Sequence, residues 1–558
     1  MIAKQTAWFV PSRPDVPTRQ RPYLAAPSDA CHAEAICAFL PCFPLVFCAP
    51  RLPAPLVTSL LRRHMNALRW ADARRKAPPN SFQQCHGLSA MLLPKREAAA
   101  VAAAALALFL LCSLPSPASA FIRIHDMRFV DADCREWAFV GANTWRMLEA
   151  QSGMIGVEVN GKNPATNLLD TAASLNISVL RVFATGVTPE LPLQTKPGVY
   201  NEVALKALDT ILAEASARGL RLVLILSRNW GGPDSRAMYA SWNGLPSPDD
   251  FYTSEAARAD FKGHLSFMVG RVNTVNGRTY RDDPTIFSWN LMNEPRYFLN
   301  GTQDPCATDP TSCAAKLQNW IAEMSAFLKQ EDPNHLVTVG EEGFFGKNSS
   351  YAGNNPQPSS DWSYATGQDF VPNHNIPTID YGGIHIWPDN WNVSTDFISS
   401  WIAAHMKAAT EMKKPLVVEE FGKNVTDQDP ATIERERNPT FKTVAGALVS
   451  SLQSGGPLRG IKYWMWDPAL VDKSSPGWSN YSQDQVFPSS STMQTIIYPT
   501  AQLAAKYRLT QVPGCTPQAA PATPTLPAKA AGPAPAVTAA SDGGSTGGRK
   551  LLREEGAA

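Results

Sequence analysis

An excess of charge of one sign is absent from this chain of 558 residues. It has 50 Lys and Arg residues against 49 Asp and Glu residues, and its formal net charge is +1. A strong field that would attract nucleic acid or an anionic membrane surface is therefore not expected. Cys-x-x-Cys pairs are absent as well. Because zinc knuckles use such pairs, no structural zinc site is predicted.

A long, unambiguous membrane span is also lacking. The apolar run Ala98–Leu114 has roughly 17 residues, which is marginal for crossing a bilayer. This run lies inside Met91–Ala120, which begins with methionine, carries charged residues at 95–97 and ends in Ala-Ser-Ala. These are the parts of a secretory signal peptide. We therefore expect residues 91–120 to be a signal peptide and the protein to be secreted.

The two ends of the chain lack the composition of a folded domain. Residues 1–90 are rich in Arg and Pro, and their apolar stretch is interrupted by closely spaced prolines. Three explanations stay open for them: translation from Met91, an organelle transit peptide, or a signal anchor retained at Ala98–Leu114. Residues 512–558 are rich in Pro, Ala, Thr and Ser and have no aromatic residue, so we expect a disordered tail.

Four of the ten cysteines follow Ala120, where an oxidising compartment would allow two disulfides. Cys306 and Cys313 are close in sequence, so we expect a local bridge between them. Cys134 and Cys515 would then join the two ends of the domain. Six glycosylation sequons agree with secretion as a glycoprotein. They begin at Asn176, Asn300, Asn348, Asn392, Asn424 and Asn480.

Residues 121–511 alternate between two kinds of segment. Helical stretches, among them 202–219, 313–330 and 397–413, lie between short runs rich in Val, Ile and Leu. Eight strands alternating with helices predict a single (β/α)8 TIM barrel, an α/β fold. The eight predicted strands are 137–143, 177–183, 220–226, 285–291, 335–340, 379–386, 415–421 and 460–466.

Carboxylates stand where two of these strands end, and active sites of such barrels lie at those ends. The fourth strand leads into Asn293 and Glu294, and the seventh carries Glu419 and Glu420 near its end. Two opposed carboxyl groups about 5–5.5 Å apart can cleave a glycosidic bond with retention of configuration. Because side chains alternate along a strand, Glu419 is expected to point to the other face and to serve a structural role.

Longer motifs surround these residues. They include "FKGHLSFMVGRVNTVNGRTYRDDPTIFSWNLMNEPR", "DPNHLVTVGEEGFFG" and "IHIWPDNW". On these motifs the sequence resembles glycoside hydrolase family 5, in particular the plant-type endo-β-1,4-mannanases, over nearly all of residues 121–511. The resemblance implies that Glu294 is the acid/base and Glu420 the nucleophile. It also implies that Asn293 binds the sugar 2-hydroxyl, and that Arg181 lies beside the nucleophile and favours its ionised form.

The resemblance further implies an active-site role for His385 and an aromatic floor under the sugar at Trp464. One departure concerns Trp387, which stands where the plant members carry tyrosine. An indole offers only an N–H donor, so subsite shape or the tuning of the nucleophile is expected to differ. Other tryptophans are candidates for sugar stacking, with packing at the rim as the alternative. They are Trp145, Trp230, Trp242 and Trp391.

The activity that the resemblance implies is retaining, endo-acting hydrolysis of β-1,4-mannosidic bonds in mannan, glucomannan or galactomannan. A β-mannan-type polysaccharide is the expected partner, and no metal or organic cofactor is expected. A monomer without stable membrane association is expected. Two alternatives stay open: an endo-β-1,4-glucanase of the same family, and a catalytically inactive sugar-binding wall protein.

Overall fold

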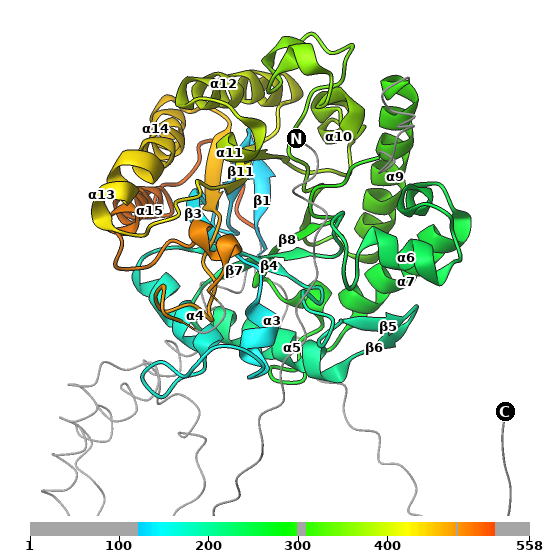
Figure 1. The fold of residues 1–558 in the computed structure, drawn as a ribbon, viewed down its shortest axis with the longest axis horizontal. Coiled ribbons are helices and arrows are strands. Elements are labelled where there is room, and N and C mark those ends of the chain that lie inside the picture. Colours follow the sequence, from blue (N-terminus) through cyan, green and yellow to red (C-terminus); the bar gives the residue numbers. More distant parts are fainter. Residues whose placement is uncertain (1–120, 298–308, 476–477, 519–558) are drawn as a thin grey trace, which may run out of the picture. The chain divides into compact units, whose positions relative to one another are not determined.

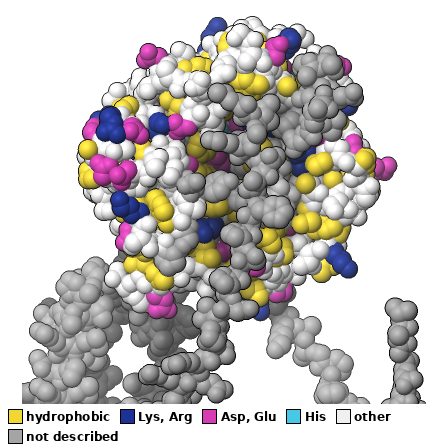
Figure 2. Space-filling model, in the orientation of Figure 1, with side chains coloured by type: hydrophobic (Ala, Val, Ile, Leu, Met, Phe, Trp, Pro, Cys, Tyr) yellow, Lys and Arg dark blue, Asp and Glu magenta, His cyan; other side chains and the backbone are white. Residues whose placement is uncertain are grey.

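The structure is a computed structural model that describes residues 121–297, 309–475 and 478–518. The expected extension at 1–90, the signal peptide at 91–120 and the tail beyond residue 518 lie outside the described residues, as do Asn300 and Cys306. Within the described ranges, no helix combines the length and the apolar character that a bilayer crossing requires. On the face shown in Figure 2, basic and acidic side chains are interspersed, as the near-zero net charge predicts.

Eight parallel strands form the centre of the fold, with helices around them (Figure 1). Their order in the sheet is β10-β11-β12-β3-β4-β7-β8-β9, so each predicted strand is present, and β10 and β9 stand at the two ends of the order. Val337 of β9 is joined to Asp380, two residues before β10, by hydrogen bonds from Asp380 N to Val337 O (2.9 Å) and from Val337 N to Asp380 Oδ2 (2.6 Å), so the barrel is nearly closed. The strands are β3 (Phe139–Thr144), β4 (Val179–Phe183), β7 (Arg221–Ile225), β8 (Ile286–Asn290), β9 (Leu336–Thr338), β10 (Gly382–Ile386), β11 (Leu416–Phe421) and β12 (Leu458–Tyr463).

The helices begin and end where local chemistry requires. The side chain of Asn201 caps α5 by accepting a hydrogen bond from Val203 N (3.0 Å), and Gly219 follows the helix at φ 69°, which suits glycine. Ser394 caps α12 in the same way. The α-helices are α3 (Met147–Gln151), α4 (Pro164–Ser174), α5 (Glu202–Ala217), α6 (Arg236–Trp242), α7 (Glu255–Gly270), α9 (Pro310–Glu331), α10 (Phe370–His374), α11 (Pro388–Trp391), α12 (Thr395–Met412), α13 (Pro430–Thr432), α14 (Asn438–Ser454) and α15 (Tyr498–Tyr507).

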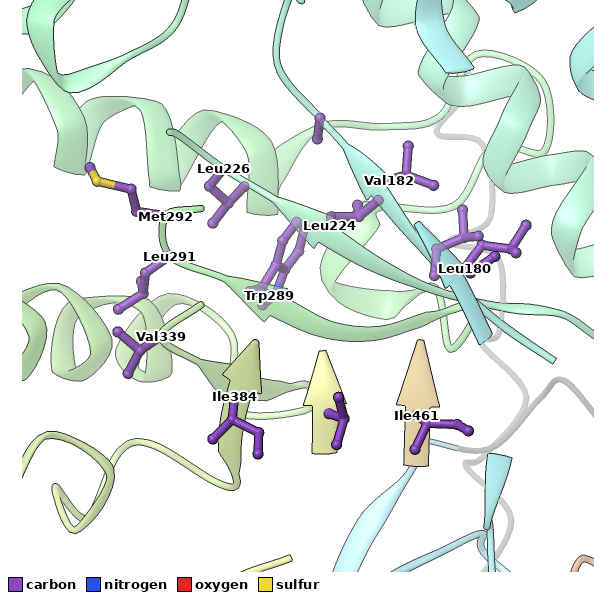
Figure 3. Packing of buried hydrophobic residues seen from close by; sticks show 14 of the residues in the cluster. Leu180, Val182, Leu224, Leu226, Trp289, Leu291, Met292, Val339, Ile384 and Ile461 are labelled. Atoms are coloured by element: carbon purple, nitrogen blue, oxygen red, sulfur yellow. The ribbon is translucent and has the colours of Figure 1, made fainter. Parts of the chain in front are cut away.

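The hydrophobic core lies between the strands and the surrounding helices. Figure 3 shows part of it, with Leu180 of β4, Leu224 of β7 and Trp289 of β8 in one buried cluster. A second cluster closes the amino-terminal end of the barrel. There Phe129, from the hairpin β1 (Arg123–His125) and β2 (Arg128–Val130), packs edge-on against Phe287 at 5.0 Å between ring centroids. Closing this end leaves the opposite end of the barrel for a site.

One disulfide expectation is confirmed. Cys134 and Cys515 are bonded, with Cα atoms 5.7 Å apart across a sequence separation of 381 residues. A backbone bridge between Arg135 and Gln511 lies beside this disulfide, so the first and last parts of the domain are joined. Cys313 is disulfide-bonded too. Its expected partner Cys306 lies outside the described residues.

Candidate active site

Two carboxylates and an imidazole meet at the carboxyl ends of the strands. Glu294 follows β8, His385 lies in β10 and Glu420 lies in β11. One oxygen of each carboxylate and one ring nitrogen of His385 all lie within 4.8 Å of one another, and the three residues are buried. The sequence placed Glu294 and Glu420 126 positions apart (420 − 294). The barrel brings them together where its fold predicts an active site.

Both oxygens of the Glu294 carboxylate have protein partners. Oε1 lies 2.7 Å from His385 Nδ1, and Oε2 accepts a hydrogen bond from the indole N–H of Trp230 at 2.5 Å. The backbone of Glu294 has φ 52°, a left-handed conformation, and its N–H donates to Gly340 O at 2.7 Å. This uncommon backbone turns the side chain toward His385. Burial lowers the pKa of His385, which favours the neutral ring.

Glu420 is held by a cation from across the barrel. Nη1 of Arg181, in β4, donates to Glu420 Oε1, and Arg181 Nη2 donates to Asn293 Oδ1 at 2.8 Å. His385 Nδ1 lies 3.5 Å from the other oxygen of Glu420. Burial raises the pKa of Glu420, while His385 and Arg181 oppose that rise by favouring the charged carboxylate. The predicted residues Arg181, Asn293 and His385 are thus all gathered around the two acids.

The orientation expected for Glu419 is wrong. Its Oε2 accepts from Asn290 Nδ2 of β8 at 3.2 Å, and its Oε1 accepts from Lys462 Nζ of β12 at 3.1 Å. These partners come from strands on different sides of the barrel, so Glu419 points into the interior, as Glu420 does. The pairing of β11 with β12 shifts register between Val418 and Phe421. Such an irregularity breaks the strict alternation of side chains. The structural role expected of Glu419 agrees with its burial beside Lys462.

Three indoles line one side of the site. The ring of Trp464 lies 6.0 Å from that of Trp387 and 6.2 Å from that of Trp145, and all three side chains are partly exposed. Trp387 packs closely over the backbone of Gly422, where an added Cβ would lie 2.7 Å from Trp387 Cζ3. The Trp145 indole donates to Asp467 at 3.2 Å. These partly exposed rings offer flat apolar surfaces beside the acids.

The other three candidate tryptophans have surroundings different from those of the three indoles that line the site. Trp391 is buried against Trp401, so its interpretation as a sugar-stacking residue is wrong. Trp242 packs edge-on against Tyr239 of the same helix, α6. Trp230 contacts Glu294 directly, a role that neither sequence interpretation included. The only hint available was its position just after the third predicted strand, near the end where the acids lie.

Sequence reasoning also missed the polar residues behind the acids. Asn143 of β3 accepts from Arg181 Nη1 at 3.1 Å and donates to Glu419 O at 2.9 Å. Arg296 pairs with Glu342, and its guanidinium lies 5.0 Å from the ring centre of Trp230. Asn143 ends the first predicted strand and Arg296 ends the "NEPR" motif, and these two places were the available indication.

Among the described residues, Glu294, His385 and Glu420 are the one group whose donor atoms are spaced for a metal ion. The hydrogen bond between His385 and Glu294 and the ion pair between Arg181 and Glu420 already satisfy these atoms. A carboxyl group hydrogen-bonded to a neutral imidazole, as Glu294 is to His385, is instead suited to moving a proton while a second carboxylate attacks.

Comparison with known proteins agrees with this geometry. Mannan endo-1,4-beta-mannosidase 1 of Arabidopsis thaliana is 34% identical over 314 residues, covering 54% of this chain and 72% of that protein. Mannan endo-1,4-beta-mannosidase 2 of Oryza sativa subsp. japonica is 34% identical over 360 residues, covering 62% and 77%. The structure of the hyperthermostable endo-1,4-beta-D-mannanase from Thermotoga petrophila RKU-1 has 27% identity and a TM-score of 0.55, covering 66% of this chain and 99% of that one. The family model that matches residues 119–487 is described as GH family 5 beta-mannosidase-like, and the chain belongs to that family.

Proposed function

We propose that this protein is a retaining endo-β-1,4-mannanase that hydrolyses internal bonds of mannan, glucomannan or galactomannan. Its family supports a glycosidase, and its plant relatives carry the name mannan endo-1,4-beta-mannosidase. The observation that carries the mechanism is the short distance between the acids. Donor oxygens of Glu294 and Glu420 lie within 4.8 Å of each other. Inverting enzymes keep their carboxyl groups roughly 6.5–9.5 Å apart to admit water, whereas retaining enzymes keep them about 5–5.5 Å apart.

The proposed reaction has two steps. In the first step a carboxylate oxygen of Glu420 attacks the anomeric carbon, the bond from that carbon to the glycosidic oxygen breaks, and Glu294 gives its proton to the departing oxygen. In the second step Glu294 removes a proton from water, the water oxygen attacks the same carbon, and the ester bond to Glu420 breaks. Two inversions at one carbon retain its configuration.

The surrounding residues have roles that follow from their contacts. Arg181 stabilises the charge of Glu420 before the attack and holds Asn293, which we assign to the sugar 2-hydroxyl. Neutral His385 lies between the two acids and donates to or accepts from Glu294 as the proton moves. Trp464, with Trp387 and Trp145 around it, is assigned to stacking against the sugar ring.

Secretion to the cell wall, removal of residues 91–120 and glycosylation belong to the same proposal. A polysaccharide of the wall is reached only outside the cytosol, and the Cys134–Cys515 disulfide suits an oxidising compartment. The amino-terminal residue of the secreted protein tests where processing occurs.

Hydrolysis assays test the activity. Reducing-sugar release is compared on glucomannan, galactomannan and carboxymethylcellulose for the wild type and for Glu294→Gln and Glu420→Gln. We expect release from the mannans, a loss of roughly 10³-fold or more in each variant, and retained configuration of the first product by NMR. Activity on cellulose alone would favour the glucanase, and binding without turnover would favour a sugar-binding wall protein.

A further inference from the structure

The indole of Trp230 does not lie free at the rim of the site. Its N–H donates to Glu294 Oε2 at 2.5 Å, while the other oxygen of Glu294 lies 2.7 Å from His385 Nδ1. The oxygen that faces Trp230 is therefore held by a group that can donate a hydrogen bond but cannot accept one. A carboxylic proton on that oxygen has no acceptor in the indole.

The position of Trp230 is fixed from two sides. The Arg296 guanidinium lies 5.0 Å from its ring centre, and Arg296 is itself paired with the buried carboxylate of Glu342. The preceding residue, Asn229, donates its backbone N–H to Asn293 O at 2.9 Å and accepts from Arg236 Nε at 2.6 Å. The Trp230 ring is thus held beside a cation, and the residue before it is hydrogen-bonded to Asn293, next to Glu294.

From this arrangement we propose that Trp230 is a positioning residue that holds the carboxylate of Glu294 for its part in the reaction, rather than a surface on which sugar stacks. The inference rests on the proposed function. A donor is more strongly attracted to a charged carboxylate than to a neutral acid, so the indole N–H is best matched to the second step, in which Glu294 acts as the base.

The hydrogen bond can be tested without any substrate. In the full secreted protein labelled with ¹⁵N-tryptophan, the indole resonance missing from Trp230→Phe identifies the Trp230 N–H. We expect this resonance to move with pH in the wild type and to stay fixed in Glu294→Gln, whose amide does not titrate. A Trp230 resonance that moves equally in both proteins, or in neither, would overturn the proposal whatever the enzyme's substrate.

The functional consequence is tested by the pH profile of kcat/KM on glucomannan. In Trp230→Phe the ring is kept and the donor is lost, so we expect the basic limb to move to higher pH by about one unit, the size of one hydrogen bond to a charged group. KM is expected to change by less than roughly twofold. The matched variant Trp242→Phe, against Tyr239 on α6, is expected to leave the basic limb in place.

The outcomes separate the two proposals. A wild type that hydrolyses no mannan contradicts the proposed function, whereas the indole titration still decides the hydrogen bond. An active wild type with an unmoved limb in Trp230→Phe contradicts the positioning role alone. A large rise in KM with an unmoved limb would identify Trp230 as a stacking surface instead. Thermal unfolding of both variants checks that the ring replacement leaves the fold intact.

Discussion

The guanidinium of Arg181 donates to the carboxylate of Glu420 across the mouth of the barrel, and both side chains are buried. They come from β4 and β11, which are not neighbours in the sheet, so the ion pair crosses the interior. Burial and the nearby Glu294 raise the pKa of Glu420, and Arg181 is one of the groups that oppose this rise. A nucleophile that must be ionised therefore depends on a cation from a distant strand.

Replacing Arg181 by methionine removes that cation while keeping an apolar stem. Burial then acts with less opposition and the pKa of Glu420 rises further. Because the attacking form is ionised, we expect the acidic limb of the kcat/KM profile to move to higher pH by about one unit or more, and kcat to fall by roughly 100-fold. The control is Arg218→Met, at an outer ion pair with Asp170. An unmoved acidic limb in Arg181→Met would contradict this role.

Glu419 and Lys462 form a fully buried ion pair below the site. Burial raises the pKa of Glu419, but Lys462 and Arg181 outweigh burial and lower it to about 2. Glu419→Gln leaves the Lys462 ammonium without its charge partner, so we expect the free energy of unfolding to fall by about 3 kcal/mol. Denaturant titration measures this. In the double variant Glu419→Gln/Lys462→Met, at least half of the loss is expected to return. A double variant less stable than the single one would argue against the pair.

Gly422 provides space for the Trp387 ring. An added Cβ would lie 2.7 Å from Trp387 Cζ3 and 3.1 Å from the carbonyl oxygen of Trp464. Gly422→Ala is thus expected to displace an indole beside the acids and to lower kcat/KM on glucomannan by roughly tenfold. Gly446→Ala, in α14 with open space at its Cβ position, is the control and is expected to keep full activity. Equal activity in the two variants would show that the position of Trp387 has little effect on turnover.

The strands were predictable because each is a short run of Val, Ile and Leu, and burial on both faces requires such runs. The ends of those strands then located Glu294 and Glu420, and the resemblance supplied Arg181, Asn293 and His385. The predicted orientation of Glu419 was wrong because it depends on how two strands pair, which the sequence of one strand does not show. The interior position of Glu419 follows from a register shift with β12, which no repeat in "PLVVEEF" indicates.

The tryptophans show the same limit. The sequence alone offered stacking or rim packing for each, because an indole suits both. Trp391 is buried by residues from α12, such as Trp401, and Trp230 meets Glu294 from another strand end. Whether a tryptophan ring is buried in the core or contacts the acids depends on contacts between segments that are distant in sequence. Those contacts exist only once the barrel has closed.

The motif "RVNTVNGRTY" was specific to the resemblance, yet it contains no residue of the site. In the structure, residues of this motif form hydrogen bonds to Asp209 of α5, whose carboxylate is buried. Arg271 Nη2 donates to it at 2.7 Å, Tyr280 Oη at 2.7 Å, and both the backbone N–H and the hydroxyl of Thr274 donate at 3.1 and 2.8 Å. The motif thereby fastens the segment after α7 to the outside of α5.

Asp209 should make stability depend on pH. Burial raises the pKa of Asp209, but the hydrogen bonds from Arg271, Tyr280 and Thr274 outweigh burial and lower it below 3.8. A group with a depressed folded pKa stabilises the fold above its unfolded pKa, and this contribution is lost as pH falls through the folded value. We expect Asp209→Asn to lower the free energy of unfolding by about 2 kcal/mol at neutral pH, measured by urea titration.

The same measurement in acid separates the charge from the shape of the side chain. Below pH 3.8 the wild-type carboxylate gradually takes up a proton, so the difference between wild type and Asp209→Asn should shrink as pH falls. Asp170→Asn, at a partly exposed pair of ion contacts with Lys162 and Arg218, is the control and should change stability by less than about 0.5 kcal/mol. A difference for Asp209→Asn that stays constant from neutral pH into acid would assign the effect to packing, because only a titrating carboxylate can make it vary.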